Sequence, residues 1–267
     1  MKINVLSDLH ISSHVRANAK DIEIYEVFKD VLSSDISVEV LCVPGDLGHD
    51  TKQSLYVLER IAVIFNFKHV IAVLGNHDLY NDNHNTSMKR FTEYVNYESE
   101  VVTILNGTTK TIDGVTFGGA MGWSYGTPYI NKVLKFGWDK DKVLGFYSQT
   151  LNDAVWIDNL DDPEEMYLME LPKLKSVYKE CDVMISHYPP AMNEALLAPE
   201  YRLEPTTGFF VMDCEDLVKD GSMQYWLAGH THTKAHATIA GTDIIVNPFG
   251  YPNELRHSNP VILAIGE

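Results

Sequence analysis

Five short apolar runs in this chain each stop at a polar cluster of aspartate, asparagine and histidine. The runs are rich in valine, isoleucine and leucine and have the length of buried β-strands. Ligands collect beyond the carboxyl ends of strands in open α/β sheets, so we expect the polar side chains to converge on one site. They belong to Asp8, His10, Asp46, His49, Asn76, His77, Asp78, His187, His230 and His232.

The first half of the chain alternates strand-like and helix-like segments. Strand-like runs cover residues 3–7, 38–45 and 69–76, whereas residues 19–32 and 51–65 repeat apolar side chains at helical spacing. This β-α-β-α-β order predicts an α/β chain, with a parallel or mixed sheet and helices packed outside it.

The pattern changes after Asn96, where β-like runs are separated by tight-turn pairs. Asn106-Gly107 and Asp113-Gly114 are typical hairpin turns, so this part predicts a series of hairpins in a second sheet. Four further strands are expected over residues 181–187, 223–230, 242–248 and 260–266.

The segment around residues 123–180 is rich in aromatic side chains and helical in character. We expect it to form peripheral helices, as a cap-like segment over one edge. Aromatic residues in this pattern are typical of a core, although a wall on which a base stacks would have the same composition. No internal repeat or low-complexity linker interrupts the chain, so we expect a single domain over residues 1–267.

The charge balance limits the partners of the protein. Its 37 acidic residues against 21 lysines and arginines give a formal net charge of −16, which repels long polyanions. A long nucleic acid is therefore disfavoured as a partner, whereas bound metal could reverse the sign of the charge locally. No motif in the sequence indicates an oligomeric state.

Cysteine content and the N-terminal residues suggest a compartment. The three cysteines are far apart and make no disulfide framework, and the first residues lack the pattern of a signal peptide. No apolar run is long enough to span a bilayer, so no membrane association is expected. We therefore expect a reduced, cytoplasmic protein.

The residue types at the strand ends suit a metal site. Carboxylate, amide and imidazole ligands without thiolate favour Mn²⁺, iron or Zn²⁺ over a structural zinc site. The series Asp-x-His, Gly-Asp, Gly-Asn-His-Asp, His and Gly-His-x-His resembles the calcineurin-like metallophosphoesterase superfamily. The resemblance runs from Asp8 to the segment Asn-Pro-Phe-Gly-Tyr-Pro-Asn-Glu, which is similar to the tail of small bacterial and viral members.

This resemblance implies a two-layer β-sandwich of mixed sheets flanked by α-helices, with a two-metal centre at one end of the sheets. It implies two divalent ions, with Mn²⁺ favoured and iron, Zn²⁺, Ni²⁺ or Mg²⁺ as alternatives. By matching motif, the implied metal ligands are Asp8, His10 and His232 for one ion, Asn76, His187 and His230 for the other, and Asp46 as a bridge.

The resemblance also implies a mechanism, in which a hydroxide between the two ions attacks phosphorus in line with the leaving group. His77 would face the substrate and stabilise the transition state or protonate the leaving oxygen. Asp78, a further candidate, is expected to hold the local turn rather than perform chemistry. His49 is expected either to contact the substrate or to hydrogen-bond another site residue.

One departure from the resemblance bears on the substrate. Protein phosphatases of this superfamily carry Gly-Asp-x-x-Asp-Arg-Gly, whereas here His49, Asp50 and Thr51 stand at the last three positions. We therefore expect a phosphodiesterase acting on a small nucleotide-type substrate. The alternatives are a phosphomonoesterase, acting on nucleotides or on Ser/Thr phosphoproteins, and a non-catalytic binding scaffold.

Overall fold

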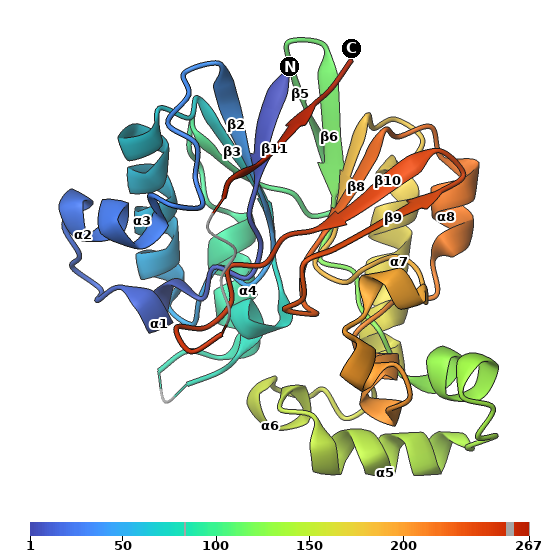
Figure 1. The fold of residues 1–267 in the computed structure, drawn as a ribbon. Coiled ribbons are helices and arrows are strands. Elements are labelled where there is room, and N and C mark those ends of the chain that lie inside the picture. The colour runs from blue at the N-terminus through green and yellow to red at the C-terminus, as the bar shows by residue number, and fades with distance from the viewer. Residues whose placement is uncertain (83, 255–258, 267) are drawn as a thin grey trace.

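The computed structural model describes residues 1–82, 84–254 and 259–266 and contains two facing β-sheets with helices on the outside (Figure 1). The first sheet has the strand order β11-β1-β2-β3-β4, and the second has the order β5-β6-β7-β8-β10-β9. Each sheet contains parallel and antiparallel pairs. The expected two-layer sandwich of mixed sheets flanked by helices is therefore confirmed.

The first sheet combines the N-terminal strands with the last strand of the chain. Strands β1 to β4 are parallel, and β11 pairs antiparallel with β1. Most residues of β1, β2 and β3 are apolar and buried, as expected for parallel strands that are covered on both faces. The bounds are Lys2–Val5 for β1, Val38–Pro44 for β2, His69–Val73 for β3, Val102–Ile104 for β4 and Val261–Ala264 for β11.

The second sheet begins with an antiparallel hairpin and continues with three parallel strands. The hairpin joins β5 to β6 through Asp113-Gly114, as the sequence predicts. β7, β8 and β10 then run parallel, and β9 closes the edge antiparallel to β10. The bounds are Thr108–Ile112 for β5, Val115–Gly119 for β6, Val183–Ile185 for β7, Tyr225–Ala228 for β8, Ala235–Ile239 for β9 and Thr242–Val246 for β10.

Two details of the predicted second sheet are wrong. Val102–Ile104 pairs parallel with β3 in the first sheet, so Asn106-Gly107 carries the chain from one sheet to the other rather than closing a hairpin. The prediction also omitted β9. This strand lies at the sheet edge and alternates exposed with buried residues, so it lacks a continuous apolar run.

Helices cover the outer face of the first sheet. α3 (Thr51–Phe65) has the predicted bounds and is capped by Asp50, whose side chain accepts a hydrogen bond from the Gln53 nitrogen at 2.8 Å. The predicted helix over residues 19–32 is shorter, because only Asp21–Phe28 (α2) is helical before the chain turns. The short α1 (Ile11–His14), α2 and α4 (Ser87–Val95) all contact α3.

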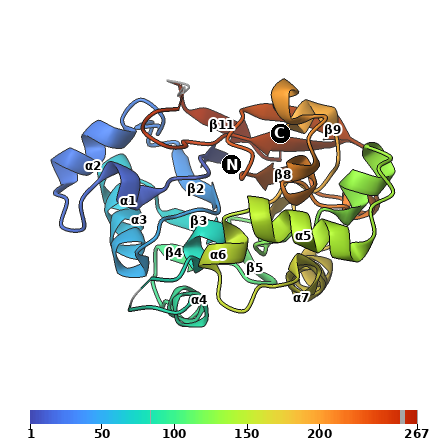
Figure 2. The same ribbon diagram turned by 90° about the horizontal axis from the view of Figure 1, so that it is seen from below.

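The 123–180 segment forms a π-helical turn (Tyr129–Val133) and helices α5 (Lys140–Thr150), α6 (Asp153–Trp156) and α7 (Pro163–Val177). α7 packs against β5 and β6 on the outer face of the second sheet. α5 and α6 lie beyond the carboxyl ends of the strands (Figure 1), and Figure 2, seen from below, shows them in front of the two sheets. Trp123, at the start of the segment, is a buried core residue.

The connection between β7 and β8 lies beside the 123–180 segment. It contains α8 (Glu215–Asp220) and 3-10 turns at Glu194–Leu196, Pro199–Tyr201 and Pro205–Phe209. A further 3-10 turn, η1 (Asn76–Leu79), follows β3.

Apolar residues of the two sheets pack against each other between the layers. Val5, Val40 and Ile71 of the first sheet share one buried cluster with Val183 and Leu227 of the second. This cluster holds the two sheets together and brings the ends of β1, β2, β3, β7 and β8 to a common rim.

All three cysteines are buried and unpaired. Burial raises the pKa of the thiols of Cys181 and Cys214 to about 12, so both remain protonated at neutral pH. Within the described ranges, no helix is both long enough and apolar enough to cross a membrane.

Candidate metal centre and active site

The polar groups predicted at the strand ends lie together at the common rim. Asp8 and His10 follow β1, Asp46 follows β2, and the η1 turn follows β3. Asp8, His10, Asp46, His230 and His232 all have positive φ, between 39° and 67°. Residues other than glycine rarely adopt this backbone conformation, and such residues cluster at functional sites.

One cluster of donor atoms joins the first and last of these motifs. Asp8, His10, Asp46 and His232 each place one ligand atom within 4.8 Å of the others. The Nε2 atoms of His10 and His232 are 3.1 Å apart, and the His232 Nε2 is 3.4 Å from Asp8 Oδ1. We call this group the first cluster.

A second cluster lies on the other side of Asp46. Asn76 Oδ1 is 3.0 Å from His187 Nε2 and 3.1 Å from His230 Nδ1, and the two histidine nitrogens are 3.1 Å apart. Asp46 contacts both clusters, because its Oδ2 lies 3.6 Å from His10 Nε2 and its Oδ1 lies 3.4 Å from His187 Nε2. His230 and His232 thus belong to different clusters.

Hydrogen-bonding rules show why a cation fits the second cluster. His187 Nδ1 lies 2.9 Å from the carbonyl oxygen of Pro44, which only accepts, so the proton of the neutral ring is on Nδ1. Its Nε2 therefore carries a lone pair, and it faces Asn76 Oδ1, which is also an acceptor. Two facing lone pairs at 3.0 Å repel each other, and a cation bound by both atoms would remove this repulsion. Adjacent donors around a metal with bonds of about 2.0–2.2 Å have this spacing.

The first cluster has a matching feature. His232 Nδ1 lies 2.9 and 3.0 Å from the two oxygens of Glu254, and this carboxylate holds the ring with Nε2 towards His10. A carboxylate that orients a histidine in this way is common behind metal ligands. Glu254 ends the Asn-Pro-Phe-Gly-Tyr-Pro-Asn-Glu segment, so the resemblance covered it, but no role was predicted for it.

The electrostatics of the rim favour bound cations. Burial and the nearby charges of Asp8 and Asp78 raise the pKa of Asp46 well above its usual range. No lysine or arginine forms an ion pair with these three aspartates in the described part of the chain. Burial lowers the pKa of His10 to about 3 and also lowers that of His187, so both rings are in the neutral form that binds metals.

His77 and His49 form a pair beside the clusters. His49 Nε2 lies 2.8 Å from His77 Nδ1, and the two rings are stacked with centroids 5.1 Å apart. The His77 ring meets that of His10 edge-on at 4.8 Å. Although His49 is exposed at the surface, partial desolvation of its ring and the nearby charge of Arg90 lower its pKa.

Asp78 lies in the same turn but contacts backbone. Its carboxylate accepts hydrogen bonds from the nitrogens of Gly75, Gly48 and Leu47 at 2.8, 3.0 and 3.2 Å. These bonds tie the loop after β2 to the loop after β3. The geometry is that of a loop clamp, with Asp78 fully buried.

Several residues around the rim were not predicted as site residues. Tyr251 stacks on His10 with ring centroids 4.1 Å apart, Tyr80 packs against His77 at 4.2 Å, and Phe210 meets His230 edge-on at 5.5 Å. Asp153 of α6 accepts a hydrogen bond from Asn76 Nδ2 at 2.8 Å. Asp153 has no sequence signal, because it lies 77 residues from Asn76 in a segment without a motif.

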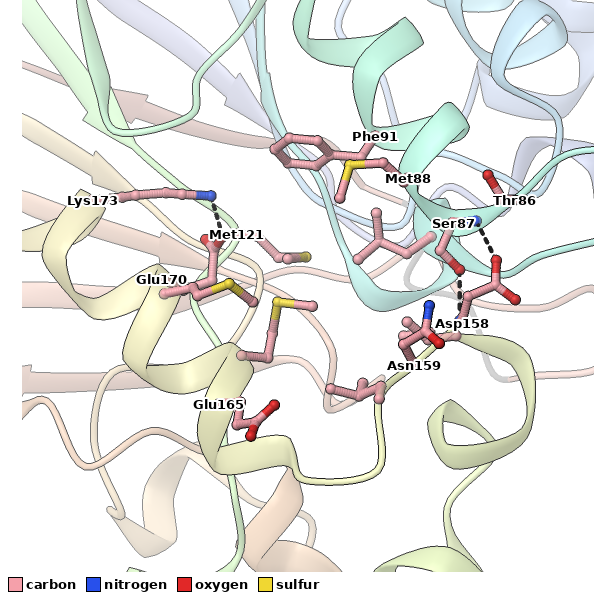
Figure 3. Close-up of a pocket in the computed structure, with 15 residues that line it drawn as sticks. Thr86, Ser87, Met88, Phe91, Met121, Asp158, Asn159, Glu165, Glu170 and Lys173 are labelled. Carbon is pink, nitrogen blue, oxygen red and sulfur yellow. Dashed lines mark hydrogen bonds and ion pairs between the residues drawn. The ribbon is translucent and has the colours of Figure 1, made fainter.

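A cavity of about 660 Å³ lies between α4 and α7, apart from the rim (Figure 3). Four methionines and Phe91 line much of it, and Leu79 of η1 is a further lining residue. None of the predicted site residues lines this cavity. The four methionines are Met88, Met121, Met166 and Met169.

An α/β sandwich with donor clusters of this kind at its strand ends defines a metallophosphoesterase. The chain belongs to the calcineurin-like phosphoesterase family, whose model matches residues 1–234. Membership in this family supports metal-dependent hydrolysis of phosphate esters, in agreement with the predicted reaction class.

Two relatives show how far the likeness extends. The uncharacterized protein L509 of Acanthamoeba polyphaga mimivirus is 23% identical over 236 residues, which are 82% of this chain and 81% of that protein. The phosphopantetheinyl hydrolase PptH of Mycobacterium tuberculosis superposes with a TM-score of 0.74 at 16% identity. That alignment covers 97% of this chain and 95% of PptH, so the two proteins share a fold over nearly their whole length.

Proposed function

We propose that the protein is a phosphodiesterase that hydrolyses a small nucleotide-type substrate with two divalent cations. The proposal rests on one observation. Two donor clusters share Asp46, and the pair formed by His77 and His49 lies beside them. Mn²⁺ is the favoured metal, because the donors are oxygen and imidazole nitrogen without thiolate. The cations would be held by Asp8, His10 and His232 in the first cluster, Asn76, His187 and His230 in the second, and Asp46 in both.

When bound, the cations would lower the pKa of water and neutralise charge on the phosphate. The chain supplies the other groups. His77 Nδ1 is engaged by His49 at 2.8 Å and lies 3.4 Å from the Tyr251 hydroxyl, so Nε2 is the ring atom left for the substrate. We assign the tautomer in which His49 Nε2–H donates to His77 Nδ1, because it places the His77 proton on Nε2. His77 can then donate to a phosphate or leaving-group oxygen.

The surroundings of the rim support a diester. A phosphate monoester carries one more negative charge than a diester and benefits from an added cation. Arg90 reaches this region, but it is buried, pairs with Asp82 and donates to the His49 carbonyl oxygen. No other lysine or arginine of the described residues bonds to the predicted catalytic residues.

Aromatic side chains support a nucleotide-type leaving group. Tyr251 and Phe210 are partly exposed beside His10 and His230, and aromatic rings stack on bases with about 1–3 kcal/mol per base. The net charge of −16 favours a compact substrate over a long polyanion.

The test compares hydrolysis of bis-p-nitrophenyl phosphate and p-nitrophenyl phosphate by the Mn²⁺-loaded protein. We expect faster turnover of the diester. Faster turnover of the monoester would overturn the diesterase assignment, and turnover of neither by protein shown to hold two ions would favour a binding scaffold. Assays of cyclic nucleotides, dinucleotides and nucleotide sugars would then identify the substrate class.

A further inference from the structure

We propose that Asp153 is a positioning residue for the second cluster, which orients the side-chain amide of Asn76 so that its oxygen faces the cation. The 123–180 segment thereby supplies a part of the metal centre. This inference rests on the proposed two-metal function and adds a residue that lies outside all the motifs of the strand ends.

The contacts of Asp153 are directed at the metal centre. Its Oδ1 accepts hydrogen bonds from Asn76 Nδ2 at 2.8 Å and from the Tyr80 hydroxyl at 2.7 Å. Asp153, Asn76 and Tyr80 are 6%, 3% and 7% exposed, so water does not compete for these bonds. Asp153 is the first residue of α6, but no side-chain cap hydrogen bond is present at this helix start.

The chemistry of the amide explains why this contact matters. An asparagine presents an oxygen on one side and an NH₂ group on the other, and an ionised carboxylate can only accept. Asp153 therefore selects the orientation in which Nδ2 faces α6 and Oδ1 faces His187 and His230. Without Asp153, the amide would gain by turning over, because its NH₂ would then meet the lone pair on His187 Nε2. The flipped amide offers no lone pair to a metal.

Other contacts attach the same segment to the rest of the protein. The Asp158 carboxylate accepts from the Ser87 nitrogen at 2.8 Å, and Ser87 Oγ accepts from the Asp158 nitrogen at 2.9 Å (Figure 3). The Asn81 nitrogen donates to the Trp156 carbonyl oxygen at 2.7 Å. α6 thus stays docked when Asp153 is changed, and Asp158 provides a control that loosens the segment without touching Asn76.

The experiment measures Mn²⁺ binding to metal-free protein by titration calorimetry and counts the bound ions by elemental analysis. Asp153→Asn keeps the shape of the side chain, but the new amide can donate as well as accept and so no longer selects the orientation of Asn76. We expect the affinity for one of the two ions to fall by about 10- to 100-fold. The other ion should bind as in the wild type, and Asp158→Asn should bind both ions normally. Wild-type affinity for both ions in folded Asp153→Asn would overturn the proposal.

An exchange of the two residues provides a second test. In the double variant Asn76→Asp with Asp153→Asn, the amide of residue 153 can donate to one oxygen of the carboxylate at position 76. The other oxygen of that carboxylate then faces the metal. We expect this variant to regain the ion affinity that Asp153→Asn loses. If Asp153 only docks α6, the affinity should not be regained. The outcomes remain distinguishable, because a wild-type protein that binds fewer than two ions contradicts the proposed function as well.

Discussion

His187 Nε2 lies 3.0 Å from Asn76 Oδ1, and neither atom carries a hydrogen when the His187 ring is neutral. The proton of His187 is on Nδ1 towards the Pro44 carbonyl oxygen, and the NH₂ group of Asn76 faces Asp153. The protein therefore holds two lone pairs against each other in a buried site, which costs free energy in the absence of a cation. Such an arrangement is preorganised for metal, and the predictions below follow from it.

Asp46→Asn should lower the affinity for both ions, because the two oxygens of Asp46 face different clusters. The loss of affinity should exceed the factor of about 10–100 that is typical when only a hydrogen-bond partner of a ligand is removed. Elemental analysis after dialysis against Mn²⁺ measures the ion content. Asp50→Asn, four residues on, is the control, because asparagine also caps helices well. Retention of two ions by Asp46→Asn would count against the shared site.

His77→Ala should keep both ions and lose turnover. Its side chain hydrogen-bonds His49 rather than either cluster, and removal of a general acid or a transition-state donor costs roughly 10²- to 10⁴-fold in rate. The measurement is kcat for bis-p-nitrophenyl phosphate together with the ion content. If the variant loses a metal ion, His77 belongs to the ligand set instead.

Gly75→Ala should disturb the metal centre without removing any ligand. A Cβ at this position would collide with Asp46 Oδ1 and lie 2.5 Å from the Asp46 nitrogen. The bridging carboxylate must then shift, so we expect weaker binding of both ions and a lower melting temperature. Gly145→Ala in α5 is the matched control, because its new Cβ would meet no atom within 4 Å beyond its chain neighbours and the backbone of its own helix. This control should gain about 0.5–1 kcal/mol of stability; wild-type ion binding by Gly75→Ala would contradict the geometry.

Glu170, which lies away from the metal centre, should make the stability of the protein depend on pH. Burial raises its pKa, although Lys173 and the Gly122 nitrogen oppose this shift. The folded state thus binds the proton more tightly than the unfolded state, and the free energy of unfolding falls as pH rises through the folded-state pKa. Glu170→Gln keeps an acceptor for the Gly122 nitrogen and has no charge to bury, so its stability relative to the wild type should increase from about pH 4 to pH 7.

Urea denaturation of both proteins at the two pH values measures this difference. Glu165→Gln removes an exposed carboxylate from the same helix and is the matched control for the loss of one charge. An equal difference between Glu170→Gln and the wild type at both pH values would show that Glu170 is not the titrating group.

Most strands and the helix Thr51–Phe65 could be predicted, because their signals are local. The run Thr51–Phe65 has the periodicity of a helix and a capping aspartate before it, and the structure has those bounds. The edge strand Ala235–Ile239 was missed, because exposed residues interrupt its apolar pattern. The sheet to which Val102–Ile104 belongs could not be read from a turn pair, because pairing between strands is a long-range contact.

The sequence by itself determined which side chains stand at the strand ends, since an apolar run followed by Asp, Asn or His is a local pattern. The resemblance implied how those groups divide between two ions, whereas only the tertiary structure supplies the distances at which His232 meets His10 and His230 meets Asn76. It alone brought Asp153 to Asn76 across 77 residues. The physical reason is that the orientation of an amide or an imidazole depends on the partner that accepts its proton, and packing supplies that partner.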